Sequence, residues 1–128
     1  MVDIQSDRQI WESDIATYWW EDDVLVSLSK SVMRTVENIE ANVRLVKRIT
    51  KNQPVPLLIY LTSSPIPDKE TRKFSAEKVP EIYSAMAMIS KPGLAQFIMK
   101  MVFALKPAPI PTRHFSNKEE ALAWLKQF

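Results

Sequence analysis

The sequence predicts an α/β fold: a mixed, mostly parallel sheet of about five strands, opened by an N-terminal hairpin and covered by about four helices. Two observations support this prediction. Apolar runs of strand length, such as residues 55–61, alternate along the chain with helix-length segments, such as residues 35–51. This alternation is typical of parallel strands joined by right-handed helical crossovers. With 128 residues and no internal repeat, we expect one domain over residues 1–128, in which residues 1–9 form a flexible N-terminus.

Composition excludes several kinds of chemistry. The chain has no cysteine, so disulfides, thiolate metal sites and cysteine nucleophiles are excluded. Its formal charge of +2 is too small and too dispersed to indicate nucleic-acid binding. The first residues lack a basic segment followed by an apolar one, so no secretory signal is predicted and a cytoplasmic protein is expected.

The first half of the chain predicts a hairpin, a helix and a central strand. Residues 10–20 and 24–28 read as strands joined by an acidic turn at residues 21–23, which lacks the spacing of a calcium loop. Residues 35–51 carry apolar side chains at intervals of three and four, with Thr35 as the helix cap. Residues 55–61 form a continuous apolar run, as expected for a strand buried on both faces.

The second half continues the alternation. Asp68 can cap a short polar helix through about Ala76, and residues 82–89 predict a second buried strand, although a helix is the competing interpretation. Residues 110–115 predict a short edge strand because they contain Pro111. Residues 116–119 read as a capping box for a closing helix. One face of that helix is expected to carry Ala121, Trp124, Leu125 and Phe128.

Residues 94–105 predict a helix with more apolar surface than one buried face requires. Gln96 and Lys100 are its only polar residues, whereas a helix on the surface of a sheet normally has an apolar stripe a little over about 100° wide. The segment is too short to span a bilayer. Either the whole helix packs into a large core, or part of it contacts a partner or an apolar ligand. The residues proposed for that contact are Phe97, Ile98, Met101, Val102 and Leu105.

Two stretches resemble a known family. Residues 57–72, and above all the strand and helix of residues 109–125, are similar to SpoIIAA-like, STAS-type bacterial domains, and the order of elements agrees from about residue 10 to 128. The resemblance implies a small non-enzymatic regulatory or binding domain of an uncharacterised branch. At the level of fold it also extends to lipid-binding SEC14-type domains.

The phosphorylation site of such anti-sigma-factor antagonists is replaced in this sequence. Their Asp-Ser-x-Gly loop corresponds to residues 68–71, where Asp68 matches but Lys69 stands in place of the serine and Thr71 in place of the glycine. Tyr60 stands where the preceding strand often ends in an acidic residue. The remaining hydroxyl groups that could accept a phosphate are those of Thr62, Ser63, Ser64 and Thr71.

A polar site is nevertheless predicted at the end of the central strand. Open α/β sheets bind ligands at the carboxyl ends of their strands. The candidate residues there are Tyr60, Asp68, Lys69 and Arg72. Catalytic, cofactor and metal residues are not predicted, because the single histidine, His114, has no nucleophile motif around it and the single glycine cannot build a nucleotide loop. A hydrolase using His114 with Ser84, Ser90 or Ser116 is the weakest interpretation.

The sequence therefore predicts contact rather than catalysis. The leading hypothesis is a non-catalytic regulatory or protein-interaction module that forms a homodimer or binds a protein partner through residues 94–105. The alternative is a domain that binds an apolar ligand or a membrane surface, with the same helix as lid or anchor and with Lys91, Lys100 and Lys106 near anionic headgroups.

Overall fold

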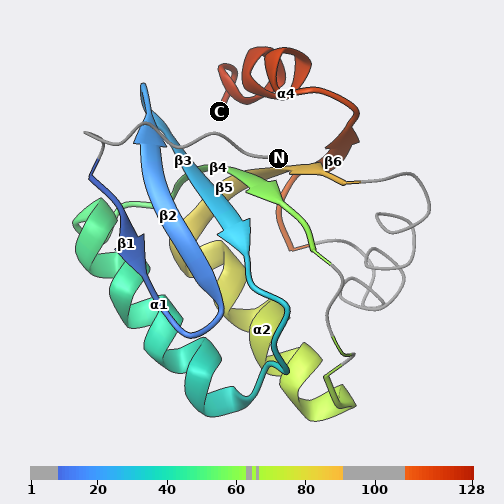
Figure 1. Ribbon diagram of the computed structural model, residues 1–128. Helices are drawn as coiled ribbons and strands as arrows, with labels where there is room; N and C mark the ends of the chain where they lie inside the picture. Colours follow the sequence, from blue (N-terminus) through green and yellow to red (C-terminus); the bar gives the residue numbers. More distant parts are fainter. Residues whose placement is uncertain (1–8, 63–64, 66, 91–108) are drawn as a thin grey trace.

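The chain forms three layers, with one sheet between helices on both of its faces (Figure 1). The computed structural model describes residues 9–62, 65, 67–90 and 109–128. Helices α1 and α2 cover one face of the sheet, and α4 covers part of the other. The strands are β1 (Trp11–Glu12), β2 (Ala16–Glu21), β3 (Val24–Ser29), β4 (Val55–Tyr60), β5 (Tyr83–Ile89) and β6 (Thr112–Phe115), and the helices are α1 (Val36–Thr50), α2 (Lys69–Ile82) and α4 (Lys118–Leu125).

The six strands lie in the sheet in the order in which they occur in the chain. β1, β2 and β3 pair antiparallel, whereas β3, β4, β5 and β6 pair parallel. The mixed, mostly parallel sheet predicted from the sequence is therefore confirmed. Because four neighbouring strands are parallel, their carboxyl ends meet at the same edge of the sheet.

The predicted first strand is in fact two strands, which is why the sheet has six strands rather than about five. The Ser13 hydroxyl accepts hydrogen bonds from the backbone N–H groups of Ile15 and Ala16, at 3.2 and 3.1 Å. This local turn reverses the chain between β1 and β2. The aromatic pattern of residues 10–20 hid the break, because strand-forming residues continue on both sides of it.

The helix predicted over residues 35–51 is confirmed as α1. Thr35 is the N-cap, its hydroxyl accepting from the N–H of Asn38 at 3.1 Å while the Asn38 side chain accepts from the N–H of Thr35 at 2.8 Å. Lys51 ends the helix in the left-handed conformation, with φ of 56°. The helix therefore spans residues 36–50, within the 35–51 expected.

α2 runs to Ile82, six residues beyond the predicted end at Ala76. Val79 and Ile82 are buried and extend the inward-facing side of the helix. Pro80 lies in the last turn, where a missing N–H removes one helical hydrogen bond without interrupting the helix. The predicted strand of residues 82–89 is confirmed as β5, which starts one residue later at Tyr83.

Two hydrophobic cores lie on opposite faces of the sheet. In β4, Leu57 belongs to the core under α1 and α2, and Leu58 belongs to the core under α4. Their side chains are 1% and 0% exposed, which confirms the expected burial on both faces. Trp19 lies in the core under α4, while Trp20 packs against the other one, as strand alternation requires.

The closing helix begins one residue later than predicted. Its N-cap is Asn117, not Ser116, and the Asn117 side chain accepts from the N–H of Glu120 at 2.9 Å. Both residue types can cap a helix, so the sequence leaves this register open. Ala121 and Leu125 are fully buried, but Phe128 lies beyond the helix and is 43% exposed. The predicted fourth helix, residues 94–105, lies outside the described residues.

Candidate functional site

The predicted contact surface lies outside the residues that the structure describes. The contact residues Phe97, Ile98, Met101, Val102 and Leu105 all lie outside the described ranges. Among the helices that are described, none is long and apolar enough to cross a bilayer.

Asp68, Lys69 and Arg72 lie together at the start of α2. The Asp68 carboxylate accepts a hydrogen bond from the N–H of Thr71 at 2.8 Å, as an N-cap does. Its hydrogen bonds with Thr71, and the nearby Arg72, hold the pKa of Asp68 below its usual value. Arg72 donates to the carbonyl oxygen of Pro67 at 2.9 Å, whereas Lys69 is exposed.

Tyr60 is not brought together with these residues. Along β4, Ile59 packs against the core under α1 and α2, and Tyr60 packs against the core under α4. Partial burial raises the pKa of Tyr60, while the charge of Lys118 on α4 lowers it and those of Glu21 and Glu119 raise it. The sheet thus separates Tyr60 from α2. The four residues predicted as one polar site therefore lie in two places, with Tyr60 on the α4 side and the other three at the start of α2.

The candidate phosphate acceptors that the structure describes are held near the capped start of α2 or in the loop before it. Thr71, one of the candidate phosphate acceptors, is only 5% exposed. The hydroxyl of Thr62, another candidate, donates to the carbonyl oxygen of Ser29 at 3.0 Å. Lys69 occupies the first helical position, where the resemblance would place a phosphorylated serine. A modification at Thr71 would first require the helix start to open.

An apolar row crosses the sheet at the carboxyl ends of its parallel strands. Leu28 is opposite Tyr60, Tyr60 is opposite Ile89, and Ile89 is opposite Phe115. All four side chains belong to the core under α4 or pack against it, and all but Phe115 are only partly buried. Sequence reasoning missed this row because its members come from four separate strands.

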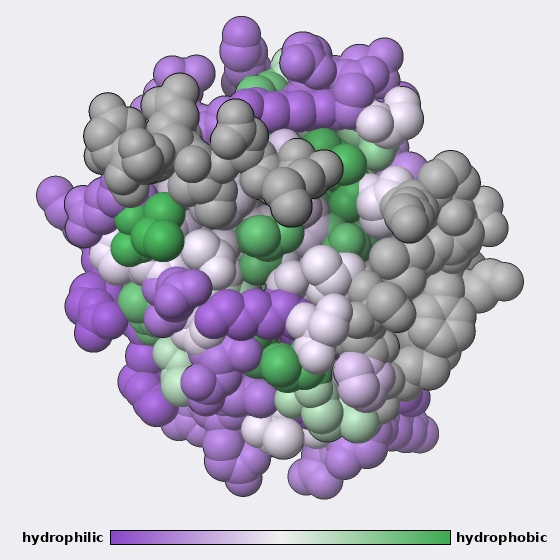
Figure 2. Space-filling view, in the orientation of Figure 1, coloured by the Kyte–Doolittle hydropathy of each residue, from purple (hydrophilic) through white to green (hydrophobic). Residues whose placement is uncertain are grey.

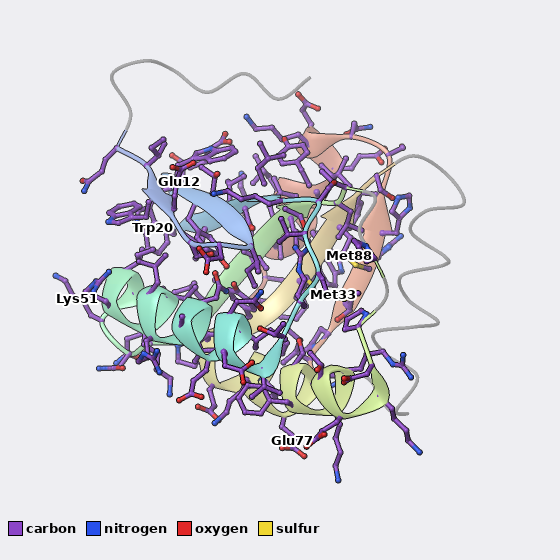
Figure 3. All side chains as sticks on the ribbon, turned by 60° about the horizontal axis from the view of Figure 1, so that its bottom comes forward. Glu12, Trp20, Met33, Lys51, Glu77 and Met88 are labelled. Atoms are coloured by element: carbon purple, nitrogen blue, oxygen red, sulfur yellow. The ribbon has the colours of Figure 1, made fainter. Side chains whose placement is uncertain are left out.

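Apolar side chains reach the surface at several other places. Figure 2 shows them as separate green patches among hydrophilic side chains on the face viewed there. Val32 and Met33, in the loop before α1, are 38% and 48% exposed, and Figure 3 labels Met33. Arg34 holds this loop with hydrogen bonds to the carbonyl oxygens of Lys30 and Val32, at 2.6 and 2.8 Å.

An aromatic series with an open hollow beside it lies at the opposite edge of the sheet from β1. The rings of Phe115 and Trp124 are 5.6 Å apart, and those of Trp124 and Phe128 are 4.8 Å apart. The guanidinium of Arg113 lies 5.2 Å from the centre of the Phe115 ring. The hollow, of about 570 Å³, runs between β6 and α4. It is lined by Arg113, His114, Phe115, Ser116, Glu120, Ala123 and Trp124.

A buried polar cluster lies between β2, β5 and α1. Asn42 is 6% exposed; its amide donates to the Tyr18 hydroxyl at 2.7 Å, and its carbonyl oxygen accepts from Ser13 at 2.6 Å. The Tyr18 hydroxyl is 3.2 Å from that of Tyr83. The four residues satisfy one another within an apolar core, which indicates a structural role.

The geometry around His114 does not form a catalytic triad. Of the three serines considered, Ser90 has its hydroxyl 3.5 Å from His114 Nε2. That distance is long for a hydrogen bond, and no carboxylate among the described residues pairs with the imidazole. Within the described ranges there is also no group of three histidine, aspartate or glutamate residues that could hold a metal ion.

The two clustered tyrosines predict a loss of stability at high pH. Burial raises the pKa of Tyr18 and, more strongly, that of Tyr83, both from an ordinary value of 10.0. Above about pH 10 the unfolded chain releases these protons first, so stability that is fully present below that pH falls as the pH rises. The free energy of unfolding, from urea titrations at about pH 9 and about pH 11, should therefore fall less in Tyr83→Phe than in the unmodified chain. Equal losses in the two proteins would contradict this assignment.

Comparisons with known proteins agree with this architecture. No curated protein matches the chain. The chain is similar to the crystal structure of an uncharacterized protein of the DUF3478 family, with a SpoIIAA-like fold, from Shewanella loihica PV-4. The two share 18% of aligned residues at a TM-score of 0.57, covering 96% of this chain and 99% of the other. At that identity the similarity shows the fold, and it confirms the SpoIIAA-like resemblance seen in the sequence.

A family model also matches residues 18–128, which include β3 to β6, most of β2 and all three described helices. This chain, with its SpoIIAA-like fold, therefore belongs to the family described as a domain of unknown function, DUF7793.

Proposed function

We propose that this chain is a non-catalytic regulatory or protein-interaction module that binds a partner at the carboxyl ends of its parallel strands. The observation that carries the proposal is the partly exposed apolar row formed by Leu28, Tyr60 and Ile89 on the α4 face. Open α/β sheets bind ligands at this edge. A row of aliphatic and aromatic side chains suits an apolar contact rather than a charged substrate.

The sequence next to this row supports the same use. Residues 94–105 begin five positions after Ile89, a member of the row, and contain only two polar residues. We propose that Phe97, Ile98, Met101, Val102 and Leu105 extend the contact surface. Self-association is then the case in which the partner is a second copy of the chain.

The arrangement of polar groups supports a role without catalysis. Asp68 acts as a helix cap, and no carboxylate among the described residues forms an ion pair with His114. The buried hydroxyls of Tyr18 and Tyr83 are occupied within the core. The SpoIIAA-like fold is consistent with such a module.

A second candidate is binding to an apolar ligand or to an anionic membrane surface. The same segment supports it, because Lys91, Lys100 and Lys106 accompany its apolar residues. Phe and Met side chains adapt to irregular apolar surfaces, including lipid. Vesicle binding separates this candidate from the first.

Substitution of Phe97 or Met101 by aspartate tests the proposal, with Gln96→Asp as a matched control at a polar position of the same segment. Light scattering gives the mass over a range of protein concentrations, and flotation with anionic vesicles at low salt gives membrane binding. We expect both aspartate variants to remain folded by circular dichroism. Their oligomeric mass or their vesicle binding should fall, whereas Gln96→Asp should retain both. Folded variants of Phe97 and Met101 that match the control in both measurements would overturn the use of residues 94–105.

A further inference from the structure

We infer that β6 is a self-association edge, at which a second copy of the chain adds its own β6 antiparallel and exchanges ion pairs between Arg113 and Glu120. This goes beyond the proposed function, because it names a different surface and does not involve residues 94–105. It rests on three features of the described residues: the backbone of an edge strand, a hollow beside it, and two charges of opposite sign in that hollow.

The backbone of β6 has groups available for another strand. β6 is the last strand of the sheet and pairs with β5 along its inner side only, among the strands that the structure describes. The carbonyl oxygen of Pro111 accepts from the N–H of Met86 on β5, at 2.9 Å. Backbone groups alternate in direction along a strand, so the N–H and C=O groups of Arg113, like the carbonyl of Pro111, point toward β5. Those of Thr112 and His114 point away from β5. Those outward groups can pair with a second strand.

The hollow carries one positive and one negative side chain, neither of which forms an ion pair with another described residue. Arg113 and Glu120 are both exposed and both line it. In the part of the chain that the structure describes, neither makes an ion pair, and the only ring contact of Arg113 is with Phe115. An acidic or a basic partner would satisfy one of these charges and oppose the other.

A second copy satisfies both charges. In a two-fold symmetric contact, residue i of one copy meets residue j of the other, and j meets i. Arg113 of each copy can then pair with Glu120 of the other, so one surface supplies both members of both pairs. This reciprocity is the reason to assign the edge to a second copy rather than to an unrelated peptide.

The alternation along β6 also selects a register. The outward residues Thr112 and His114 must form the hydrogen-bonded pairs of an antiparallel contact. Centring the two-fold axis on Arg113 would set two arginines directly opposite each other, which is unfavourable. Centring it on His114 sets Arg113 opposite Phe115 of the second copy, where the guanidinium can face the ring as it already does within one chain. We therefore infer the register centred on His114.

Charge exchange tests this contact. The variants are Arg113→Glu, Glu120→Arg and the double variant carrying both, with Glu77→Arg as the control for a charge reversal elsewhere. Glu77 is exposed on α2, and Figure 3 shows it projecting away from the sheet. The dimer dissociation constant is measured by sedimentation equilibrium at low salt, and folding by circular dichroism.

The unmodified chain and Glu77→Arg should be dimeric with similar dissociation constants. Each single reversal at residues 113 or 120 should raise the dissociation constant at least about tenfold, because each creates two like-charge contacts. The double variant, and an equimolar mixture of the two single variants, should recover dimers because opposite charges again face each other. His114→Pro removes an outward N–H without removing a bond to β5, and should weaken the dimer as well.

A monomeric unmodified chain would overturn the inference, as would a double variant no tighter than either single one. These outcomes are separate from the test of residues 94–105. Phe97→Asp leaves the charges at residues 113 and 120 in place, so recovery by charge exchange is expected in that background too. Failure of the charge exchange leaves partner or vesicle binding by residues 94–105 untouched.

Discussion

Replacing Asn42 by alanine is expected to lower the free energy of unfolding by about 2–4 kcal/mol. The Asn42 side chain is buried on α1 and joins three chain segments by bonding Ser13 and Tyr18. Its removal takes away the acceptor of the Ser13 hydroxyl, which keeps its bonds from the N–H groups of Ile15 and Ala16, and a partner of the buried Tyr18 hydroxyl. It also leaves a cavity under α1. Urea denaturation followed by circular dichroism measures the change.

Two variants separate this effect from a general effect of substitution. Arg44→Ala removes an exposed ion pair with Glu40 on the same helix, and should cost no more than about 0.5 kcal/mol. Tyr83→Phe keeps the ring and removes one hydroxyl, so Tyr18 retains Asn42 and the loss should be about 1 kcal/mol. If Asn42→Ala lost no more stability than Arg44→Ala, the buried cluster would not contribute to the fold as described.

Replacing Arg34 by methionine is expected to lower the free energy of unfolding by about 3 kcal/mol and to loosen the loop before α1. Besides its two bonds within the loop, the guanidinium donates to the carbonyl oxygen of Ile15 at 3.1 Å and to the Ser29 hydroxyl at 2.6 Å. Burial of the guanidinium lowers the pKa of Arg34. Because the site is partly buried, water cannot easily replace the hydrogen bonds that the substitution removes. Methionine keeps the apolar stem and removes the donors.

Hydrogen exchange and urea denaturation measure this second prediction. Amide exchange should become faster in residues 30–35 before it does in the sheet. Arg48→Met is the matched control, because Arg48 is exposed on α1 and should change stability by less than about 0.5 kcal/mol. Equal stabilities of the two variants, with unchanged exchange in the loop, would show that Arg34 does not organise this region.

The sequence predicted the regular elements where local signals and burial agree. The run at residues 55–61 has apolar side chains on both faces, and β4 indeed has a neighbouring strand on each side and a hydrophobic core on each face. Thr35 and the spacing of apolar residues placed α1 within one residue at each end. Errors arose where a local bond competes with the pattern, as Ser13 does between β1 and β2 and Asn117 does at the start of α4.

The candidate site was harder to predict than the fold. Tyr60 ends β4 and Asp68 lies at the end of the loop that follows it, yet the two lie on different faces of the sheet. The alternation of side chains along β4 directs Tyr60 to the α4 side. The apolar row, the hollow beside β6 and the cluster around Asn42 each combine residues from distant segments. Such a combination leaves no periodic signal in the sequence.

The sequence by itself determined the class of fold, the family resemblance and the loss of the serine from the SpoIIAA-like loop, because these depend on residue identity and on spacing along the chain. Only the tertiary structure decided that Asp68 caps a helix apart from Tyr60, and that Arg113 and Glu120 share one hollow. The physical reason is strand pairing. Register and face determine which side chains meet across a sheet, and both are fixed by contacts between residues far apart in sequence.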